Sequence, residues 1–302
     1  MKNKLGLTEV CPQCSEKSLR FFETGDRNRR LSGETFNYYR CPACELIFLR
    51  PIPANLGDYY PPSYYSSITT YAELLRAAQP EQYKIEIVKQ FAPGGRLLEI
   101  GPGGGGFVCL AKEAGYEVEA IEMDSGVCRF LTEVVGVQAI NSADVGKALE
   151  ATKSYDIIAL WHNFEHLPEP WEALEAAATS LAPNGVLVIA APNPFAFQFR
   201  VLGRFWTHVD APRHLQLIPI SVLVQRAESL GLTTRLITTR DVGTLGWNAF
   251  GWRESFGNFI TFSERAKLLA RRIGDAVSWL LRPVEQSGLR GSAYTIVFQR
   301  RC

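Results

Sequence analysis

A run of glycines constrains this chain more than any other feature of its sequence. Residues 101–106 read Gly-Pro-Gly-Gly-Gly-Gly and separate an apolar segment, Arg96–Ile100, from a segment of helical character over 107–114. A strand that passes through glycines into a helix lets the backbone approach a ligand closely at the helix amino terminus. The spacing satisfies the dinucleotide fingerprint GxGxxG, so the run alone leaves NAD and other adenosine cofactors open.

The residues that follow extend this strand and helix into a parallel α/β sheet. From about residue 81, short apolar runs alternate with helical segments, and we expect further strands over 117–121 and 137–140. Glu122 ends the first of these strands, about 20 residues beyond the glycines, where an acidic side chain binds ribose hydroxyls. Met123 could lie against an adenine ring. Asp144 is either an acceptor for the adenine amino group or a helix cap.

Three segments together resemble the class I S-adenosylmethionine-dependent methyltransferases. The sequence Leu97-Leu98-Glu99-Ile100-Gly101-Pro102-Gly103-Gly104-Gly105 resembles the ExGxGxG motif of this family. Residues 155–167 resemble its fourth strand with the H-x-x-E-H loop, and residues 181–189 resemble the next turn and strand, with Asn184 where glycine is usual. The resemblance covers residues 81–240 and resumes at the last strand.

The resemblance implies a Rossmann-like, seven-stranded α/β sheet that ends in an antiparallel hairpin, with S-adenosylmethionine as methyl donor. For the hairpin we expect strands over 233–239 and 293–299. This hairpin separates methyltransferases from dinucleotide dehydrogenases and disfavours NAD. The residues implied in binding the cofactor are Glu99, Gly101, Gly103, Gly105, Glu122, Met123, Asp144 and His162.

Four histidines are candidates for a general base. Methyl transfer from a sulfonium is an in-line displacement, and an alcohol acceptor must lose a proton during it. His162 and His166 follow the fourth strand, and His208 and His214 follow the fifth, at the edge where open α/β sheets bind ligands. The resemblance implies His214 or His166 as the base, and Arg213 as a site for a carboxylate or phosphate of the acceptor. The alternative for each histidine is a structural hydrogen bond, which we favour for His162 and His208.

Two Cys-Pro-x-Cys hooks precede this domain, formed by Cys11 with Cys14 and by Cys41 with Cys44. A gap of two residues turns both thiolates toward one ion, and two such hooks complete a tetrahedral sulfur site for zinc with no open position. A closed zinc site is structural, because it folds a short module that buries too little by itself. A redox-active dithiol is the alternative.

The hooks and the segment after them resemble a zinc-ribbon subgroup of the same family, found among bacterial enzymes that methylate sugars and other secondary metabolites. Residues 51–80 contain many prolines and tyrosines without a helical period, so we expect an extended linker. The predicted domains are a zinc ribbon over 1–50, this linker, and a methyltransferase domain over 81–302. The resemblance implies a hydroxyl of a sugar or glycan precursor as the acceptor.

A long insertion separates the last two predicted strands. It spans residues 242–290, which exceeds the usual length of a hairpin connection. Its residues 264–282 place apolar side chains at helical spacing behind a basic start. Such a helix either makes a peripheral membrane contact, or packs on the domain or on a second subunit in a homodimer. The aromatic residues before it are candidates for a lid.

Charge and composition narrow the classes of partner. The 32 Lys and Arg residues against 31 Asp and Glu residues leave a net charge of +1, whereas proteins that coat nucleic acid carry a basic excess. We therefore expect a small-molecule acceptor. An RNA methyltransferase that grips its substrate with the ribbon, and a non-catalytic cofactor-binding scaffold, are the alternatives. No apolar run has the length of a signal peptide or a membrane span, so we expect a cytoplasmic location.

Overall fold

The computed structural model describes residues 8–61, 68–150 and 154–301. Parts of the predicted ribbon (1–7) and of the predicted linker (62–67) lie outside this range. The chain divides into two compact units whose segments alternate along the sequence. Unit 1 comprises Met1–Tyr59, Ala191–Leu223 and Thr238–Tyr294, and unit 2 comprises Tyr60–Ala190, Val224–Ile237 and Thr295–Cys302.

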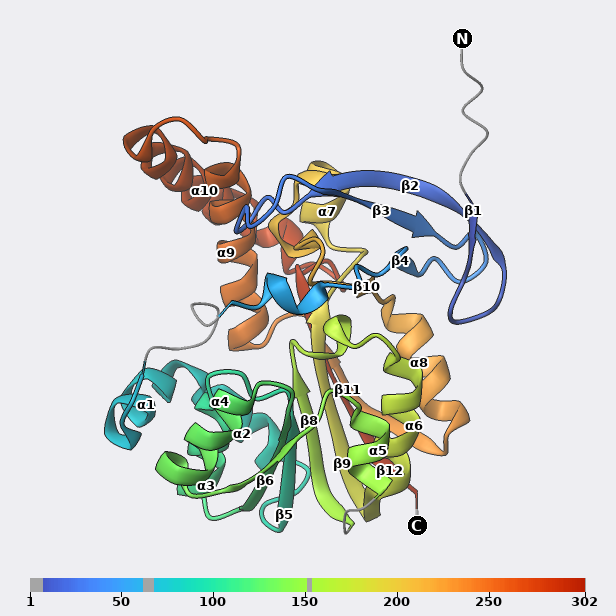
Figure 1. The fold of residues 1–302 in the computed structure, drawn as a ribbon, viewed down its shortest axis with the longest axis vertical. Coiled ribbons are helices and arrows are strands. Elements are labelled where there is room, and N and C mark those ends of the chain that lie inside the picture. Colours follow the sequence, from blue (N-terminus) through green and yellow to red (C-terminus); the bar gives the residue numbers. More distant parts are fainter. Residues whose placement is uncertain (1–7, 62–67, 151–153, 302) are drawn as a thin grey trace. The chain divides into compact units, whose positions relative to one another are not determined.

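Unit 2 is built on a seven-stranded mixed sheet. Its strands are β5 (Arg96–Ile100), β6 (Glu117–Glu122), β7 (Gln138–Asn141), β8 (Tyr155–Trp161), β9 (Leu181–Pro192), β11 (Leu232–Thr238) and β12 (Ala293–Arg300). Their order is β11-β12-β9-β8-β5-β6-β7 (Figure 1). The pairs β5–β6, β5–β8, β6–β7 and β8–β9 are parallel, and β11 and β12 provide the antiparallel hairpin. The predicted α/β methyltransferase sheet is therefore confirmed.

The central strands are continuous apolar runs because both of their faces are covered. Every residue of β5 after Arg96 is buried, as is every residue of β8 except Asp156. Early in β9, Asn184 has a φ of +64°. Asparagine visits this left-handed conformation more readily than most residues, so it can stand where the family usually has glycine.

Helices cover both faces of this sheet. Figure 1 shows α1 to α4 on one side and α5, α6 and α8 on the other. Buried side chains of α1 to α4 form one apolar core with the sheet, to which Leu74, Ile85, Phe107 and Val127 contribute. The helical segments are α1 (Tyr71–Ala78), η3 (Gln79–Glu81), α2 (Gln82–Lys89), α3 (Gly106–Glu113), α4 (Ser125–Phe130), η4 (Leu131–Val135), α5 (Val145–Glu150), η5 (Phe164–His166), α6 (Pro170–Ser180) and α8 (Ile220–Ser229).

Helix α1 differs from the extended conformation expected for residues 51–80. Thr70 caps the helix by accepting a hydrogen bond from the Glu73 N–H (3.3 Å), and Leu74 and Ala78 are buried. Threonine followed three residues later by glutamate is the sequence signature of a capping box. This local signal identifies the helix, although the prolines and tyrosines around it suggest a linker.

Unit 1 contains a five-stranded antiparallel sheet. Its strands are β1 (Thr8–Val10), β2 (Lys17–Gly25), β3 (Thr35–Arg40), β4 (Ile47–Leu49) and β10 (Gln216–Leu217), paired in this order. β10 comes from a distant part of the sequence and extends the sheet at β4. Tyr38, Phe48 and Leu49 are buried in this sheet. The remaining elements of unit 1 are η1 (Leu56–Tyr59), α7 (Phe197–Leu202), η6 (Gly203–Phe205), η7 (Thr207–Val209), α9 (Val242–Asn258) and α10 (Glu264–Glu285).

The predicted insertion forms a helical pair. α10 includes the predicted helix over 264–282 and begins after Ser263, which caps it by accepting a hydrogen bond from the Ala266 N–H. A Cβ built on Gly274 of α10 would lie 2.7 Å from the carbonyl oxygen of Trp252 in α9, so glycine permits a close approach of the two helices. Among the described residues, no helix is both long and apolar enough to cross a bilayer.

Candidate functional site

In the glycine loop after β5, glycine serves different structural purposes at two positions. Gly101 has a φ of +69°, and a Cβ on it would lie 1.9 Å from the side-chain nitrogen of Asn163. Gly103 has a φ of +53°, and nothing lies within 4 Å of the position of a Cβ there. Gly101 is therefore required for packing, whereas Gly103 leaves open space above the loop, of the kind in which a ligand can approach the backbone.

Glu122 and the glycine loop lie together, as the spacing predicts. The Glu122 carboxylate accepts hydrogen bonds from the N–H groups of Gly103 (3.2 Å) and Asp124 (3.0 Å). Glu122 is 5% exposed, and burial raises the pKa of its carboxyl group. Met123 follows at the surface and is half exposed. An acidic acceptor for hydroxyl groups thus stands beside the open part of the loop.

Glu99, in β5, is 3% exposed, and one of its carboxylate oxygens has no hydrogen-bond partner in the described ranges of the chain. Burial raises the pKa of its carboxyl group to about 8, while the charge of Lys84 acts in the opposite direction. Lys84 is held by an ion pair with Glu81 at 2.6 Å. Among the described residues, Glu99 Oε2, Trp161 Nε1 and Asn163 Oδ1 are buried without a hydrogen-bond partner. Unsatisfied buried groups of this kind fit a polar ligand that supplies both donors and acceptors.

Lys84, Trp161 and Asn163 were not assigned to the site from sequence. Trp161 and Asn163 belong to the motif at the end of the fourth strand, but within this motif the predicted site residues are His162 and His166. Lys84 has no motif of its own, because its contact with this region depends on how α2 packs.

Asp144 caps a helix. Its Oδ1 accepts a hydrogen bond from the Lys147 N–H (3.0 Å) at the start of α5. The residue also borders a cavity of about 220 Å³, whose lining includes Leu167, Glu169 and Glu172. The glycine loop and Glu122 do not line this cavity. A contact of Asp144 with adenine stays a prediction.

His162 follows β8 in a left-handed conformation with a φ of +54°. Its N–H donates to the Ala190 carbonyl (2.9 Å), and its Nδ1 lies 3.8 Å from the carboxylate of Glu165. Glu165 is 1% exposed. The ring is thereby positioned by the loop after β8, and a part in holding the cofactor stays a prediction.

The two candidate bases belong to different units. In unit 2, Nδ1 of His166 lies 2.9 Å from the hydroxyl of Tyr60. In unit 1, Nδ1 of His214 lies 2.7 Å from the carbonyl oxygen of His208 and must donate to it. This bond fixes the neutral tautomer of His214 with its lone pair on Nε2, as a general base requires. The catalytic role of either histidine stays a prediction.

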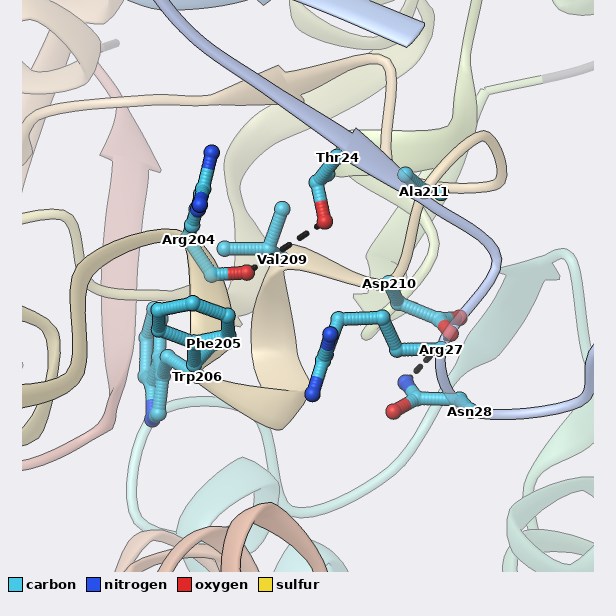
Figure 2. A pocket seen from close by; sticks show the side chains of 10 residues that line it. Thr24, Arg27, Asn28, Arg204, Phe205, Trp206, Val209, Asp210 and Ala211 are labelled. Atoms are coloured by element: carbon cyan, nitrogen blue, oxygen red, sulfur yellow. Dashed lines mark hydrogen bonds between the residues drawn. The ribbon is translucent and has the colours of Figure 1, made fainter. Parts of the chain in front are cut away.

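Arg213 does not have the anion-binding role expected for it. Its guanidinium is completely buried and donates to the carboxylates of Asp26 (2.7 Å) and Asp210 (2.7 and 2.9 Å). Asn28 adds a hydrogen bond to Asp210 at 2.5 Å, which Figure 2 shows. Arg213 holds the pKa of Asp210 well below its usual range. The expectation was wrong because two internal carboxylates already occupy this guanidinium.

His208 makes packing and hydrogen-bond contacts of the structural kind favoured for it, and its role stays a prediction. Its ring is packed against Trp206 and Trp247, with centroid separations of 4.8 and 5.5 Å. Its Nε2 lies 3.2 Å from the carbonyl oxygen of Trp247.

The four hook cysteines converge in unit 1. The Sγ atoms of Cys11 and Cys44 are 3.6 Å apart, and those of Cys14 and Cys41 are 3.4 Å apart. All four sulfurs lie within 4.8 Å of one another. Tetrahedral ligands at a Zn–S distance of about 2.3 Å are about 3.8 Å apart, so this cluster has the size of a zinc site.

The two hooks also share one backbone geometry. In the first, the Ser15 N–H donates to the Cys11 carbonyl, and in the second the Glu45 N–H donates to the Cys41 carbonyl, each at 3.0 Å. Ser15 and Glu45 both have a φ of +61°. Burial raises the pKa of the Cys11 thiol to about 11, whereas at Cys41 hydrogen bonds outweigh burial and lower the pKa of the thiol to about 7. The matched geometry of the two hooks, with four sulfurs brought together, is what fits a metal site.

Comparison with known proteins gives the family. A family model described as "Methyltransferase domain" matches residues 71–236. The ubiquinone biosynthesis O-methyltransferase of Aeromonas salmonicida (strain A449) is 29% identical over 153 residues, covering 47% of this chain and 64% of that protein. The corresponding protein of Xanthomonas campestris pv. campestris (strain B100) is 28% identical over 136 residues, covering 43% and 57%. The chain thus spans less than two thirds of the length of these curated relatives.

The fold agrees with this match. The crystal structure of a SAM-dependent methyltransferase from Archaeoglobus fulgidus has a TM-score of 0.50 and 18% sequence identity, and the alignment covers 74% of this chain and 94% of that one. Together, the matched residues 71–236, the strand order and the hairpin show that this chain belongs to the methyltransferase-domain family and carries a class I S-adenosylmethionine-dependent methyltransferase domain.

Proposed function

We propose that this protein transfers a methyl group from S-adenosylmethionine to an oxygen atom of a small-molecule acceptor. The observation that carries the proposal is the buried Glu122 carboxylate, bonded to the Gly103 N–H beside an open glycine loop in a matched methyltransferase domain. A buried acid at this place serves no apolar core, whereas it suits the hydroxyls of an adenosine.

The residues of unit 2 would divide the binding of the cofactor among them. The cofactor supplies an activated methyl group on a sulfonium, so the chain mainly has to orient it. The loop at Gly101, Gly103 and Gly105 would give backbone contacts, and Glu122 would accept hydrogen bonds from the ribose. Met123 and Asp144 would contact the adenine. The buried Glu99 and the loop at His162 would serve the charged amino-acid end, since Glu99 has an unsatisfied oxygen.

A hydroxyl acceptor needs a base, and we assign this role to His214 or His166. His214 is the better candidate because its Nδ1 bond to the His208 carbonyl leaves Nε2 as the basic nitrogen. His166 has its Nδ1 at the Tyr60 hydroxyl, which orients the ring in a similar way. A base of this kind accepts the acceptor's proton as the new C–O bond forms.

For the acceptor, the names of the relatives favour oxygen chemistry. The relatives from Aeromonas and Xanthomonas are named O-methyltransferases of ubiquinone biosynthesis. The sugar-like acceptor rests on the resemblance of the cysteine hooks alone, and these relatives lend it no support. We therefore place hydroxyls of ubiquinone precursors, tested with phenols as simple analogues, before sugar hydroxyls as the acceptor class.

The cysteine cluster completes the proposal. We assign it a structural zinc ion in a ribbon over 1–50, followed by a connecting segment over 51–80 and a methyltransferase domain over 81–302, in a protein that acts in the cytoplasm. The sulfur spacing and the two identical hooks support the zinc.

Methyl-labelled S-adenosylmethionine tests the function. The protein is incubated with separate panels of phenols, free and activated sugars, and RNA. We expect the unchanged protein to transfer label to a phenol or a sugar. The His214→Ala variant should lose this transfer and keep its affinity for the cofactor. Label only in RNA would show that the acceptor class is wrong. Cofactor binding without transfer to any panel would favour a non-catalytic scaffold.

A further inference from the structure

Helix α10 has one face that is committed to packing within unit 1. Gly274 lies against the backbone of Trp252 in α9, and Arg271 donates to the Glu254 carboxylate at 2.7 Å. Glu285 near the end of α10 is 1% exposed and accepts a hydrogen bond from the Trp252 indole (3.0 Å). These contacts fix the rotation of α10 about its axis and decide which side chains face outward.

The opposite face of α10 exposes large apolar side chains in a row. Leu269, Ile273 and Leu280 are 60%, 47% and 68% exposed, and their spacing of four and seven residues places them on one stripe. Trp279 beside the stripe is 77% exposed, and Phe262 just before the helix is 82% exposed. Single exposed leucines are ordinary, whereas a contiguous apolar patch marks an interaction surface.

One margin of this stripe is basic. By helical spacing Arg265 and Arg272 lie beside it, both are exposed, and no ion pair involves them within the part of the chain that the structure describes. The acidic Asp275 lies 3.9 Å from Arg253 of α9, which offsets its charge. The exposed face therefore combines an apolar stripe with uncompensated arginines.

Further positive charge lies at the α9–α10 turn. The guanidinium carbon of Arg27 is 4.8 Å from the ring centre of Phe205 and 5.5 Å from that of Phe259, which is in the turn. Arg204 lies over the same Phe205 ring at 4.9 Å. Figure 2 shows Arg27 and Arg204 around Phe205 at the edge of a small pocket. Arg30 reaches the turn by donating to the Asn258 carbonyl (3.1 Å).

We propose that the exposed face of α10, together with Phe262, is a peripheral membrane-binding surface that inserts shallowly into bilayers rich in anionic lipid. Arginines at the margin of an apolar helical stripe match anionic head groups, and an exposed tryptophan suits the bilayer interface. A second copy of the chain is a poorer occupant, because symmetric pairing of two such faces brings the basic margins together. Such binding would determine where the protein acts and does not depend on methyl transfer.

Co-sedimentation with lipid vesicles tests the proposal on the full chain. Vesicles of phosphatidylcholine with about 30% phosphatidylglycerol should bind the protein, and pure phosphatidylcholine vesicles or high salt should weaken binding about tenfold. The double variant Ile273→Glu/Leu280→Glu should lose binding to a similar extent. Val201→Glu changes an apolar residue of α7 that is 58% exposed and should bind as the unchanged protein does.

Several outcomes would overturn the proposal. One is equal sedimentation of the double variant and the unchanged protein, and another is the absence of binding to anionic vesicles. Light scattering could instead show a dimer that dissociates in the double variant. That result, together with no binding to vesicles, would assign the face to a second copy of the chain. Because the changed side chains are exposed, the melting temperature of the double variant should match that of Val201→Glu; a large drop would show that the face is packed instead.

Discussion

At the scale of single residues, Gly103 and Gly115 have similar backbone conformations in different surroundings. Both have positive φ values, +53° and +88°, and a Cβ would meet nothing within 4 Å at either. Valine at either position should cost about 1–3 kcal/mol of stability from backbone strain. Only Gly103 bonds to Glu122 beside the proposed cofactor.

We therefore expect Gly103→Val to abolish binding of S-adenosylhomocysteine in calorimetry, and Gly115→Val to retain it. Equal affinity in the two variants at a temperature where both are folded would remove the glycine loop from the cofactor site.

Glu99 gives a prediction of pH dependence. Its pKa is raised from 4.5 to about 8, so the folded protein holds this proton more tightly than the unfolded chain does. The stability that it contributes is full below about pH 4.5 and is lost as the pH rises toward 8. Glu99→Gln removes this loss. The free energy of unfolding of the variant, relative to that of the unchanged protein, should therefore increase between pH 5 and pH 8.

Urea denaturation at a series of pH values measures this difference, with the exposed Glu86→Gln as control. If the difference in free energy of unfolding between Glu99→Gln and the unchanged protein does not increase with pH, Glu99 is ionised in the folded protein.

The sequence predicts some of these residues and does not reveal others, for a physical reason. Glu122 was identified because strand length and loop spacing place it at the sheet edge next to the glycines. The sequence does not reveal the partners of Arg213, because Asp26 is far away in the sequence and only tertiary packing brings the two residues together. A guanidinium in a motif does not reveal whether an internal carboxylate already occupies it.

At the scale of elements, the two cysteine hooks make a prediction about metal content. Cys14 contributes one sulfur to the cluster, whereas Cys109 is buried in α3 outside it. Cys14→Ser should lose most of the zinc, and Cys109→Ser should retain about one ion per chain, because a closed site needs all four ligands. Elemental analysis of the purified variants checks this. Full zinc in Cys14→Ser, or none in the unchanged protein, would contradict a structural zinc site.

The cluster around Arg213 joins elements that are distant in sequence. It links the loop after β2, through Asp26, to the segment after η7, through Asp210. Arg213→Leu leaves the buried Asp26 and the partly buried Asp210 without their cation and should destabilise unit 1 by about 3–5 kcal/mol. Arg200→Leu, at an exposed position, should change stability by less than about 0.5 kcal/mol.

Chemical denaturation followed by tryptophan fluorescence measures both variants. The pKa of Asp210 is held down by Arg213, so the ion pair stabilises the fold at neutral pH and this stability is lost as the pH falls into the acid range. A deficit of Arg213→Leu that persists undiminished in acid would show that packing, and not charge, explains the loss.

Most elements of unit 2 follow from local patterns. Strand β5 has the predicted bounds, β6 extends one residue beyond the predicted end, and β7 is displaced by one residue at both ends. These strands are short apolar runs bounded by glycine or polar residues, so their ends are marked in the sequence. Helix α1 was missed because prolines and tyrosines nearby outweighed its capping signal.

At the scale of the whole molecule, the units could not be predicted from sequence. The predicted domains are continuous stretches, whereas unit 1 combines the cysteine hooks with Ala191–Leu223 and Thr238–Tyr294. Pairing of β10 with β4 is one cause, because it joins residues that nothing local connects. The candidate cofactor residues, by contrast, all lie in unit 2, within residues 60–190.

The proposed methyl transfer depends on binding of an adenosyl cofactor by Glu122 and the loop between β5 and α3. Isothermal titration of the zinc-loaded protein with S-adenosylmethionine, S-adenosylhomocysteine and NAD tests it most directly. We expect saturable heat from both adenosyl ligands at about one site per chain, and none from NAD. A folded protein that gives no heat with either adenosyl ligand at millimolar concentration would contradict it.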